Sequence, residues 1–151
     1  TNEDYEFNVR VKQSGGVVWL DPTIRSVYFA RPNLQALTKQ YWRYGFWKAR
    51  MLQRYMNTLR WRQALPPLFV ATLILLILLS SWLPIARWLL GLQVFVYLIV
   101  LLLAAIPIAW KKKDWFMMVG LPLAIMTMHL SWGAGLLVGI IAPGRIQEKQ
   151  G

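Results

Sequence analysis

Three long apolar stretches occupy most of the second half of the chain. They cover residues 65–83, 88–110 and 115–141, contain no Lys, Arg, Asp or Glu, and include one histidine, His129. A helix needs about 20 consecutive apolar residues to cross the hydrocarbon core of a bilayer, so each stretch is long enough. A chain of 151 residues is too small to bury three such helices in a soluble core. The sequence therefore predicts three transmembrane helices.

The remainder of the chain is polar and strongly basic. Residues 1–62 hold eleven of the seventeen Lys and Arg residues and four of the six acidic residues, and the net charge of the whole chain is +11. The absence of cysteine excludes a disulfide framework and a thiol nucleophile, and a single histidine excludes a multi-histidine metal site. We expect a polar part at 1–62 followed by a membrane region at 63–151.

The distribution of Lys and Arg near the ends of the stretches predicts the orientation in the membrane. Six basic residues lie between positions 43 and 62, just before the first stretch, and three more, at 111–113, separate the second from the third. The opposite side has only Arg87, Arg145 and Lys149. The excess of positive charge marks the cytoplasmic side, so residues 1–62 are expected in the cytoplasm and the C-terminal end outside.

Residues 1–32 give mixed signals. The polar and acidic residues at 1–4 are typical of a helix start, whereas the alternation of apolar and polar residues over 5–11 is typical of a strand. The Gly-Gly pair at 15–16 fits a helix C-cap or a turn. Two short β-rich runs follow at 17–20 and 24–30, separated by an Asp-Pro turn signal.

The pattern over residues 33–55 predicts a longer amphipathic helix, capped by Asn33. One apolar stripe has helical spacing and contains Leu34, Leu37, Tyr41, Tyr44, Met51 and Tyr55. A neighbouring face contains Gln40, Arg43, Trp47, Arg50 and Arg54. Such a helix is expected to lie at a membrane surface. Its basic residues could serve only to attract anionic lipid, and that interpretation stays open at this stage.

Two motifs in this order resemble those of a known enzyme family. The sequence Glu-Asp-Tyr-Glu at 3–6, with Arg10 and the Gly pair at 15–16, resembles the acidic motif of family-2 inverting glycosyltransferases. The sequence Gln-Tyr-Trp-Arg-Tyr at 40–44 resembles the Gln-x-x-Arg-Trp motif of the membrane-bound members, which include cellulose and hyaluronan synthases. Segments 19–22, 44–48 and 129–133 look more like bacterial exopolysaccharide transferases of the succinoglycan type.

The resemblance implies a role for each matching residue. Asp4 would be the general base that deprotonates the acceptor hydroxyl, and Glu3 would support that site. Gln40 and Arg43 would lie near the donor diphosphate and the acceptor, and Arg43 would offset charge on the leaving group. Tyr44 stands where the family motif has Trp, so acceptor binding and processivity are not implied by the match. The resemblance also favours a helix over 3–14.

The resemblance further implies a fold and a location. Residues 1–62 would be an α/β remnant, the C-terminal part of a Rossmann-like GT-A catalytic domain, and three transmembrane helices would follow in a bacterial inner membrane. The family's Asp-x-Asp motif, which holds a divalent metal such as Mg or Mn, does not occur in this chain. The chain begins with Thr, so we expect a C-terminal piece that is inactive alone.

The implied activity is transfer of a sugar from a nucleotide-sugar donor to a polysaccharide or lipid-linked acceptor. Membrane lipids are expected partners and nucleic acid is not, because membrane topology already accounts for the clustered basic residues. The alternative function is a non-enzymatic membrane adaptor that binds anionic lipid or a partner through the basic helix. Within the third stretch, His129 is a candidate functional residue or a hydrogen-bond partner for a neighbouring helix. The Gly-x-x-x-Gly pattern at 135–139 is expected to pack against another helix of this chain.

Overall fold

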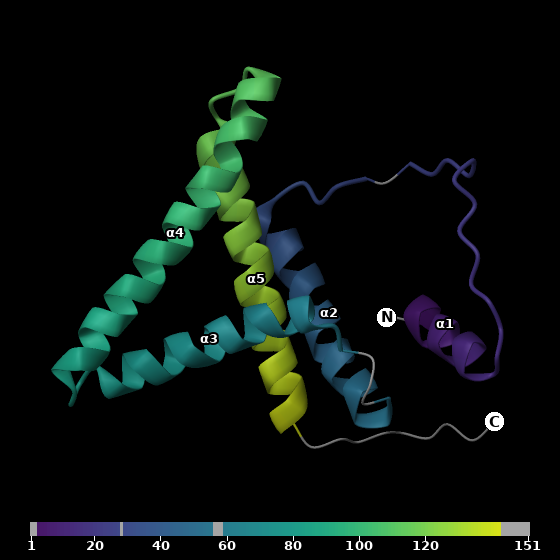
Figure 1. Ribbon diagram of the computed structural model, residues 1–151, viewed down its shortest axis with the longest axis horizontal. Coiled ribbons are helices and arrows are strands. Elements are labelled where there is room, and N and C mark those ends of the chain that lie inside the picture. The colour runs from purple at the N-terminus through teal and green to yellow at the C-terminus, as the bar shows by residue number, and fades with distance from the viewer. Residues whose placement is uncertain (1–2, 28, 56–58, 143–151) are drawn as a thin grey trace.

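The computed structural model contains five helices in the part of the chain that it describes, which is residues 3–27, 29–55 and 59–142. Side chains are described in the same ranges except at 3–6 and 54. The helices are α1 (Glu3–Gln13), α2 (Leu34–Arg54), α3 (Trp61–Leu79), α4 (Pro84–Lys112) and α5 (Met117–Ile141). Figure 1 shows α1 set apart from the other four helices, which contact one another.

Helix α1 confirms the helical interpretation of the first residues over the strand-like alternation. Two basic residues, Arg10 and Lys12, lie in its last turn, where a positive charge interacts favourably with the helix dipole. The helix ends at the predicted glycine pair. Gly15 adopts φ 82°, a left-handed conformation that favours glycine, and the backbone N–H of Gly16 donates to the carbonyl of Val11 at 2.8 Å.

The two β-rich runs at 17–20 and 24–30 form no strand in the described residues, so the expected α/β remnant is not seen. Asp21 and Thr23 instead make a local turn, in which the backbone N–H and the hydroxyl of Thr23 both donate to Oδ1 of Asp21. These bonds hold the pKa of Asp21 below its ordinary value. A strand needs the hydrogen bonds of a neighbouring strand, and β-propensity alone does not supply them. Many apolar side chains of this segment are exposed, including Val17, Trp19, Leu20, Ile24, Val27 and Phe29.

Helix α2 confirms the helix expected over 33–55 almost to the residue. The side chain of Asn33 accepts a hydrogen bond from the backbone N–H of Ala36 at 2.8 Å, as an N-cap does. Its placement at a membrane surface stays a prediction.

Helices α3, α4 and α5 are long and apolar enough to cross a membrane, judged by length and composition. This agrees with the three predicted stretches and indicates a membrane protein. Two of the helices begin four residues earlier than the sequence predicts, α3 at Trp61 and α4 at Pro84. The helical conformation continues past each predicted boundary into the flanking residues, so hydropathy alone does not fix the end of a helix. As a result, Pro66 and Pro67 lie inside α3 and not at its start.

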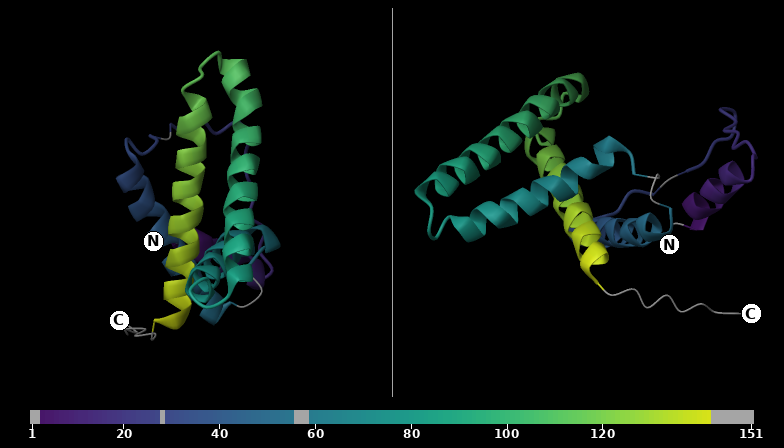
Figure 2. Two further views of the ribbon diagram at one scale, coloured as in Figure 1. Left: turned by 90° about the vertical axis from the view of Figure 1, so that its left-hand side faces the viewer. Right: turned by 60° about the horizontal axis from the view of Figure 1, so that its bottom comes forward.

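The four packed helices form an open arrangement, not a parallel bundle. Helices α3 and α4 form a hairpin, α4 leads back to α5, and the first half of α3 crosses α5 (Figure 1). Both further views show α2 lying beside the second half of α5 (Figure 2). The two helices run in the same direction, because Gly135 lies against Trp42 and Gly139 lies against Ala49.

Small residues bring these helices close together. A Cβ atom built on Gly139 would lie 2.7 Å from Cβ of Ala49, and one built on Gly133 would lie 2.7 Å from the carbonyl oxygen of Pro66 in α3. Both distances are too short for a real Cβ atom, so each position needs glycine. The Gly-x-x-x-Gly pattern at 135–139 therefore packs within this chain, as the sequence predicts.

Candidate functional site

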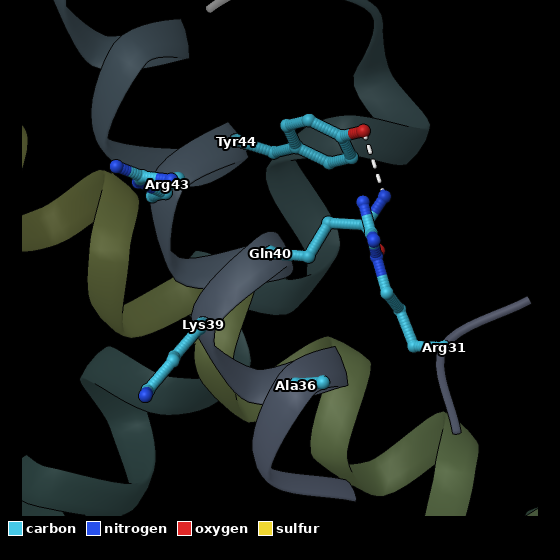
Figure 3. Close-up of a pocket in the computed structure, with 6 residues that line it drawn as sticks. All are labelled: Arg31, Ala36, Lys39, Gln40, Arg43 and Tyr44. Atoms are coloured by element: carbon cyan, nitrogen blue, oxygen red, sulfur yellow. Dashed lines mark hydrogen bonds between the residues drawn. The ribbon is translucent and has the colours of Figure 1, made fainter. Parts of the chain in front are cut away.

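The site begins with a pocket of about 340 Å³ at the N-terminal half of α2. Its lining residues are Arg31, Ala36, Lys39, Gln40, Arg43 and Tyr44 (Figure 3). Three of them, Gln40, Arg43 and Tyr44, are residues that the sequence singled out as substrate-binding. Positions three and four apart on a helix lie on one face, so the cap at Asn33 and the helix that follows bring them together. Their roles are still predictions.

A chain of hydrogen bonds links the loop before α2 to the helix. The Nε–H of Arg31 donates to Oε1 of Gln40 at 2.7 Å, and Nε2 of Gln40 donates to the hydroxyl oxygen of Tyr44 at 2.8 Å. The ring of Tyr44 also packs edge-on to Tyr41, with 5.8 Å between the ring centroids. In Figure 3 the side chains of Arg31, Gln40 and Tyr44 converge, whereas Lys39 and Arg43 point away from this group.

The pocket is positively charged. Arg31, Lys39 and Arg43 line it, and no carboxylate among the described side chains does. Among the described side chains the carboxylates are Asp21 and Asp114, and both accept hydrogen bonds from residues two positions further along the chain. Guanidinium and ammonium groups without a neighbouring carboxylate are suited to bind a phosphate or another anion.

Asp4 and Glu3, the predicted base and its support, lie in the first turn of α1. Their side chains fall outside the described part of the chain, and their roles stay predictions. Within the described residues no group of three or more His, Asp or Glu side chains could hold a metal ion. The residues described here thus offer no site for the Mg or Mn that the resemblance implies, and that cofactor stays an untested expectation.

Sequence reasoning missed three lining residues, the apolar Ala36 and the two cations Arg31 and Lys39. Lys39 lies one helical turn before Arg43 on the same helix, so its spacing could have revealed it. Arg31 lies outside the helix and nine positions before Gln40, and no local pattern predicts a contact of that kind.

Polar side chains also meet among the three apolar helices, away from the pocket. The hydroxyl of Tyr97 in α4 lies 3.1 Å from Nδ1 of His129 in α5. The Nε2 of Gln93 donates to Oγ1 of Thr72 in α3 at 2.9 Å. The interpretation of His129 as a hydrogen-bond partner for a neighbouring helix is therefore supported by its contact with Tyr97.

Comparison with known proteins gives two curated relatives. The chain is 25% identical over 141 residues to the dolichyl N-acetyl-alpha-D-glucosaminyl phosphate 3-beta-D-2,3-diacetamido-2,3-dideoxy-beta-D-glucuronosyltransferase of Methanococcus voltae, with 93% of this chain and 40% of the relative covered. It is 30% identical over 134 residues to the succinoglycan biosynthesis protein ExoA of Rhizobium meliloti, with 89% of this chain and 39% of the relative covered. No family profile and no solved structure matches the chain.

The chain is related to glycosyltransferases. The relationship predicted from the motifs is confirmed at this level, while inversion at the sugar carbon and assignment to family 2 are still predictions. The chain spans about 40% of the length of the curated relatives that it matches. What the relatives' names say of substrate and product therefore applies to those proteins, and for this chain it enters only as a proposal.

Proposed function

We propose that the chain is part of a membrane-anchored glycosyltransferase of family 2 that transfers a sugar with inversion. The donor is a nucleotide sugar and the acceptor is a polysaccharide or a lipid-linked glycan. The observation that carries the proposal is the pocket in which the motif residues Gln40, Arg43 and Tyr44 lie together with two further cations. It occurs in a chain related to glycosyltransferases.

In the proposed reaction, the acceptor hydroxyl oxygen attacks the anomeric carbon of the donor. The bond between that carbon and the diphosphate oxygen breaks, and the hydroxyl proton passes to the carboxylate of Asp4. Negative charge develops on the departing nucleoside diphosphate. Arg43 and Lys39 offset this charge, and such stabilisation lowers the barrier most where water is excluded. Glu3 supports the base.

The membrane part anchors this site. We propose that residues 1–62 lie on the cytoplasmic side of a bacterial inner membrane, where nucleotide sugars are made, and that α3 and α4 cross the bilayer as a hairpin. The pocket then lies close to the membrane surface, because α2 precedes α3 by only a few residues and packs against α5. That position suits an acceptor held in or near the membrane.

The test compares full-length variants for sugar transfer to membrane acceptors from a panel of radiolabelled nucleotide sugars. We expect Asp4→Asn to lower transfer by about 10²–10⁴-fold, the usual contribution of a general base. Wild-type transfer by Asp4→Asn would remove the assigned base. The adaptor alternative predicts instead that the full-length protein transfers no sugar, and that charge reversal at Arg50 and Arg54 releases a lipid or protein partner.

A further inference from the structure

We propose that Arg31, Gln40 and Tyr44 form a hydrogen-bond relay with one fixed direction, which leaves the hydroxyl proton of Tyr44 free to bind a phosphate oxygen of the substrate. The inference rests on the proposed function and adds two things to it. It gives Arg31 a positioning role, and it assigns Tyr44 a specific contact with an anionic ligand.

The chemistry of Arg31 sets the direction of the relay. An amide side chain has a donor end and an acceptor end, which are easily interchanged, but a guanidinium group can only donate. The Nε–H of Arg31 lies 2.7 Å from the Gln40 side chain, so the atom facing it must be the acceptor Oε1. The amide nitrogen Nε2 then faces the other way, toward Tyr44 at 2.8 Å.

The orientation of Gln40 in turn decides what Tyr44 can offer. A phenol hydroxyl can accept one hydrogen bond at its oxygen and donate another through its O–H. Because its oxygen accepts from Nε2 of Gln40, its own O–H is left to donate elsewhere. Tyr44 lines the pocket and is 36% exposed, so a ligand can reach this hydroxyl. The positive charge of Arg31 at the far end of the relay polarises the bonds and strengthens the donor.

The relay depends on the one position where this chain departs from the family motif that it resembles. A Trp in place of Tyr44 has an indole N–H that donates and cannot accept. It would leave Nε2 of Gln40 without this acceptor, so the Arg31–Gln40–Tyr44 chain would end at Gln40. The Tyr at position 44 therefore transmits the orientation of Gln40 to the pocket, which a Trp cannot do.

The surrounding charge identifies the ligand group. Lys39 and Arg43 line the same pocket, and none of the described carboxylates does. A neutral donor among cations is suited to a phosphate oxygen. That oxygen can belong to the diphosphate of a nucleotide sugar or to the phosphate of a lipid-linked acceptor. Both sources share the same chemistry, and the experiment separates them.

The test measures binding to the purified full-length protein by calorimetry, with inorganic pyrophosphate in one arm and polyprenyl phosphate in nanodiscs in the other. We expect Tyr44→Phe to weaken binding in one of the two arms by about tenfold, the effect of one hydrogen bond to a charged group. The arm that responds identifies the source of the phosphate. An unchanged affinity of Tyr44→Phe in both arms would overturn the proposal.

A double-mutant cycle tests whether Arg31 acts through Tyr44. We expect Arg31→Gln to weaken binding about as much as Tyr44→Phe, and the double variant to be no weaker than either single one. Lys39→Gln is the matched control, because it removes a cation from the same pocket outside the relay, and its effect should multiply with that of Tyr44→Phe. Effects of Arg31→Gln and Tyr44→Phe that multiply would show that Arg31 binds the ligand independently and would contradict the relay.

Two further variants distinguish a failure of the relay from a failure of the proposed function. Gln40→Leu breaks the relay at its centre and replaces Arg31→Gln in the cycle if the latter does not fold. Arg43→Gln tests the proposed function itself. If Arg43→Gln weakens binding and Tyr44→Phe does not, the relay alone is wrong. If neither variant affects binding or sugar transfer, the proposed function fails as well.

Discussion

Gly45 in α2 lies directly against the backbone carbonyl oxygen of Trp132 in α5, and a Cβ atom on this glycine would overlap with that oxygen. The contact joins the helix that carries the candidate site to a helix of the membrane region. It is the central one of three such contacts, since Gly135 lies against Trp42 and Gly139 against Ala49. The position of the pocket relative to the membrane helices thus depends on glycines, which have no Cβ atom to hold the two helices apart.

We predict opposite effects of the same substitution at two helical glycines. Gly45→Ala should lower the free energy of unfolding by about 1–3 kcal/mol, because the added methyl group forces α2 away from α5. Gly91→Ala in α4 is the matched control, since a Cβ atom there meets nothing within 4 Å. That variant should gain up to about 1 kcal/mol from helix propensity. Thermal unfolding in detergent checks both, and a rise in melting temperature for Gly45→Ala would contradict the close packing.

Local patterns accounted for much of the fold. The cap at Asn33, the glycine end of α1 and the three apolar helices follow from interactions within a few residues of each other, and sequence patterns report these well. The β-rich runs at 17–20 and 24–30 form no strand in the described residues, because strand formation depends on a partner that β-propensity does not specify.

In the candidate site, too, features set by local sequence were predicted and a contact between distant residues was not. Gln40, Arg43 and Tyr44 were identified through their resemblance to the Gln-x-x-Arg-Trp motif, and their spacing on one helix brings them to the same pocket. Arg31 was missed because its contact with Gln40 depends on how the loop folds back onto α2. The packing face of α2 was also unexpected. It contains Gly45 and Ala49, which lie outside the predicted apolar stripe and match small residues on α5.

We predict that Arg43 contributes to binding of the donor diphosphate. Arg43→Gln in the full-length protein should raise KM for the nucleotide sugar by about 10- to 100-fold, because a hydrogen bond to a charged group contributes about 1.5–3 kcal/mol. Lys111→Gln is the control, since it removes the same charge outside the pocket. Equal effects of the two variants on KM would mean that total charge, and not the pocket, attracts the donor.

We predict a modest stabilising role for the polar contacts between the apolar helices. Tyr97→Phe removes the hydroxyl that lies 3.1 Å from Nδ1 of His129 and keeps the ring stacked on Phe69, with 4.4 Å between the centroids. Hydrogen bonds between membrane helices contribute about 0.6 kcal/mol on average, so the loss should be of this order. Tyr97→Leu removes the stacking as well and should cost more. Unfolding in detergent compares the two variants. Equal losses would show that stacking of the ring on Phe69 contributes nothing beyond the apolar contact that Leu also makes.

The last prediction concerns the orientation of α5 in the membrane, for which the charge distribution and the helix contacts give different answers. The charge distribution places the C-terminal end of α5 on the side opposite to α2. In the structure, however, Gly139 packs against Ala49 of α2, and Gly133 packs against Pro66, which lies close to the basic start of α3. If α5 ended on the far side, α2 would enter the bilayer beside it with Lys39, Arg43, Lys48 and Arg50. Each cation costs about 2.5–3.5 kcal/mol at the centre of a membrane helix.

We therefore expect both ends of α5 to lie on the side of α2, with only α3 and α4 crossing the bilayer. This stretch of chain contains no cysteine, so single cysteines can be introduced without interference from it. In a full-length protein whose other cysteines have been replaced, Ala142→Cys should react with an impermeant maleimide from the same side as Lys112→Cys. Ser81→Cys, between α3 and α4, should react from the opposite side. Labelling of Ala142→Cys together with Ser81→Cys would support the orientation predicted by charge, and it would mean that the packing of α5 on α2 does not persist in the bilayer.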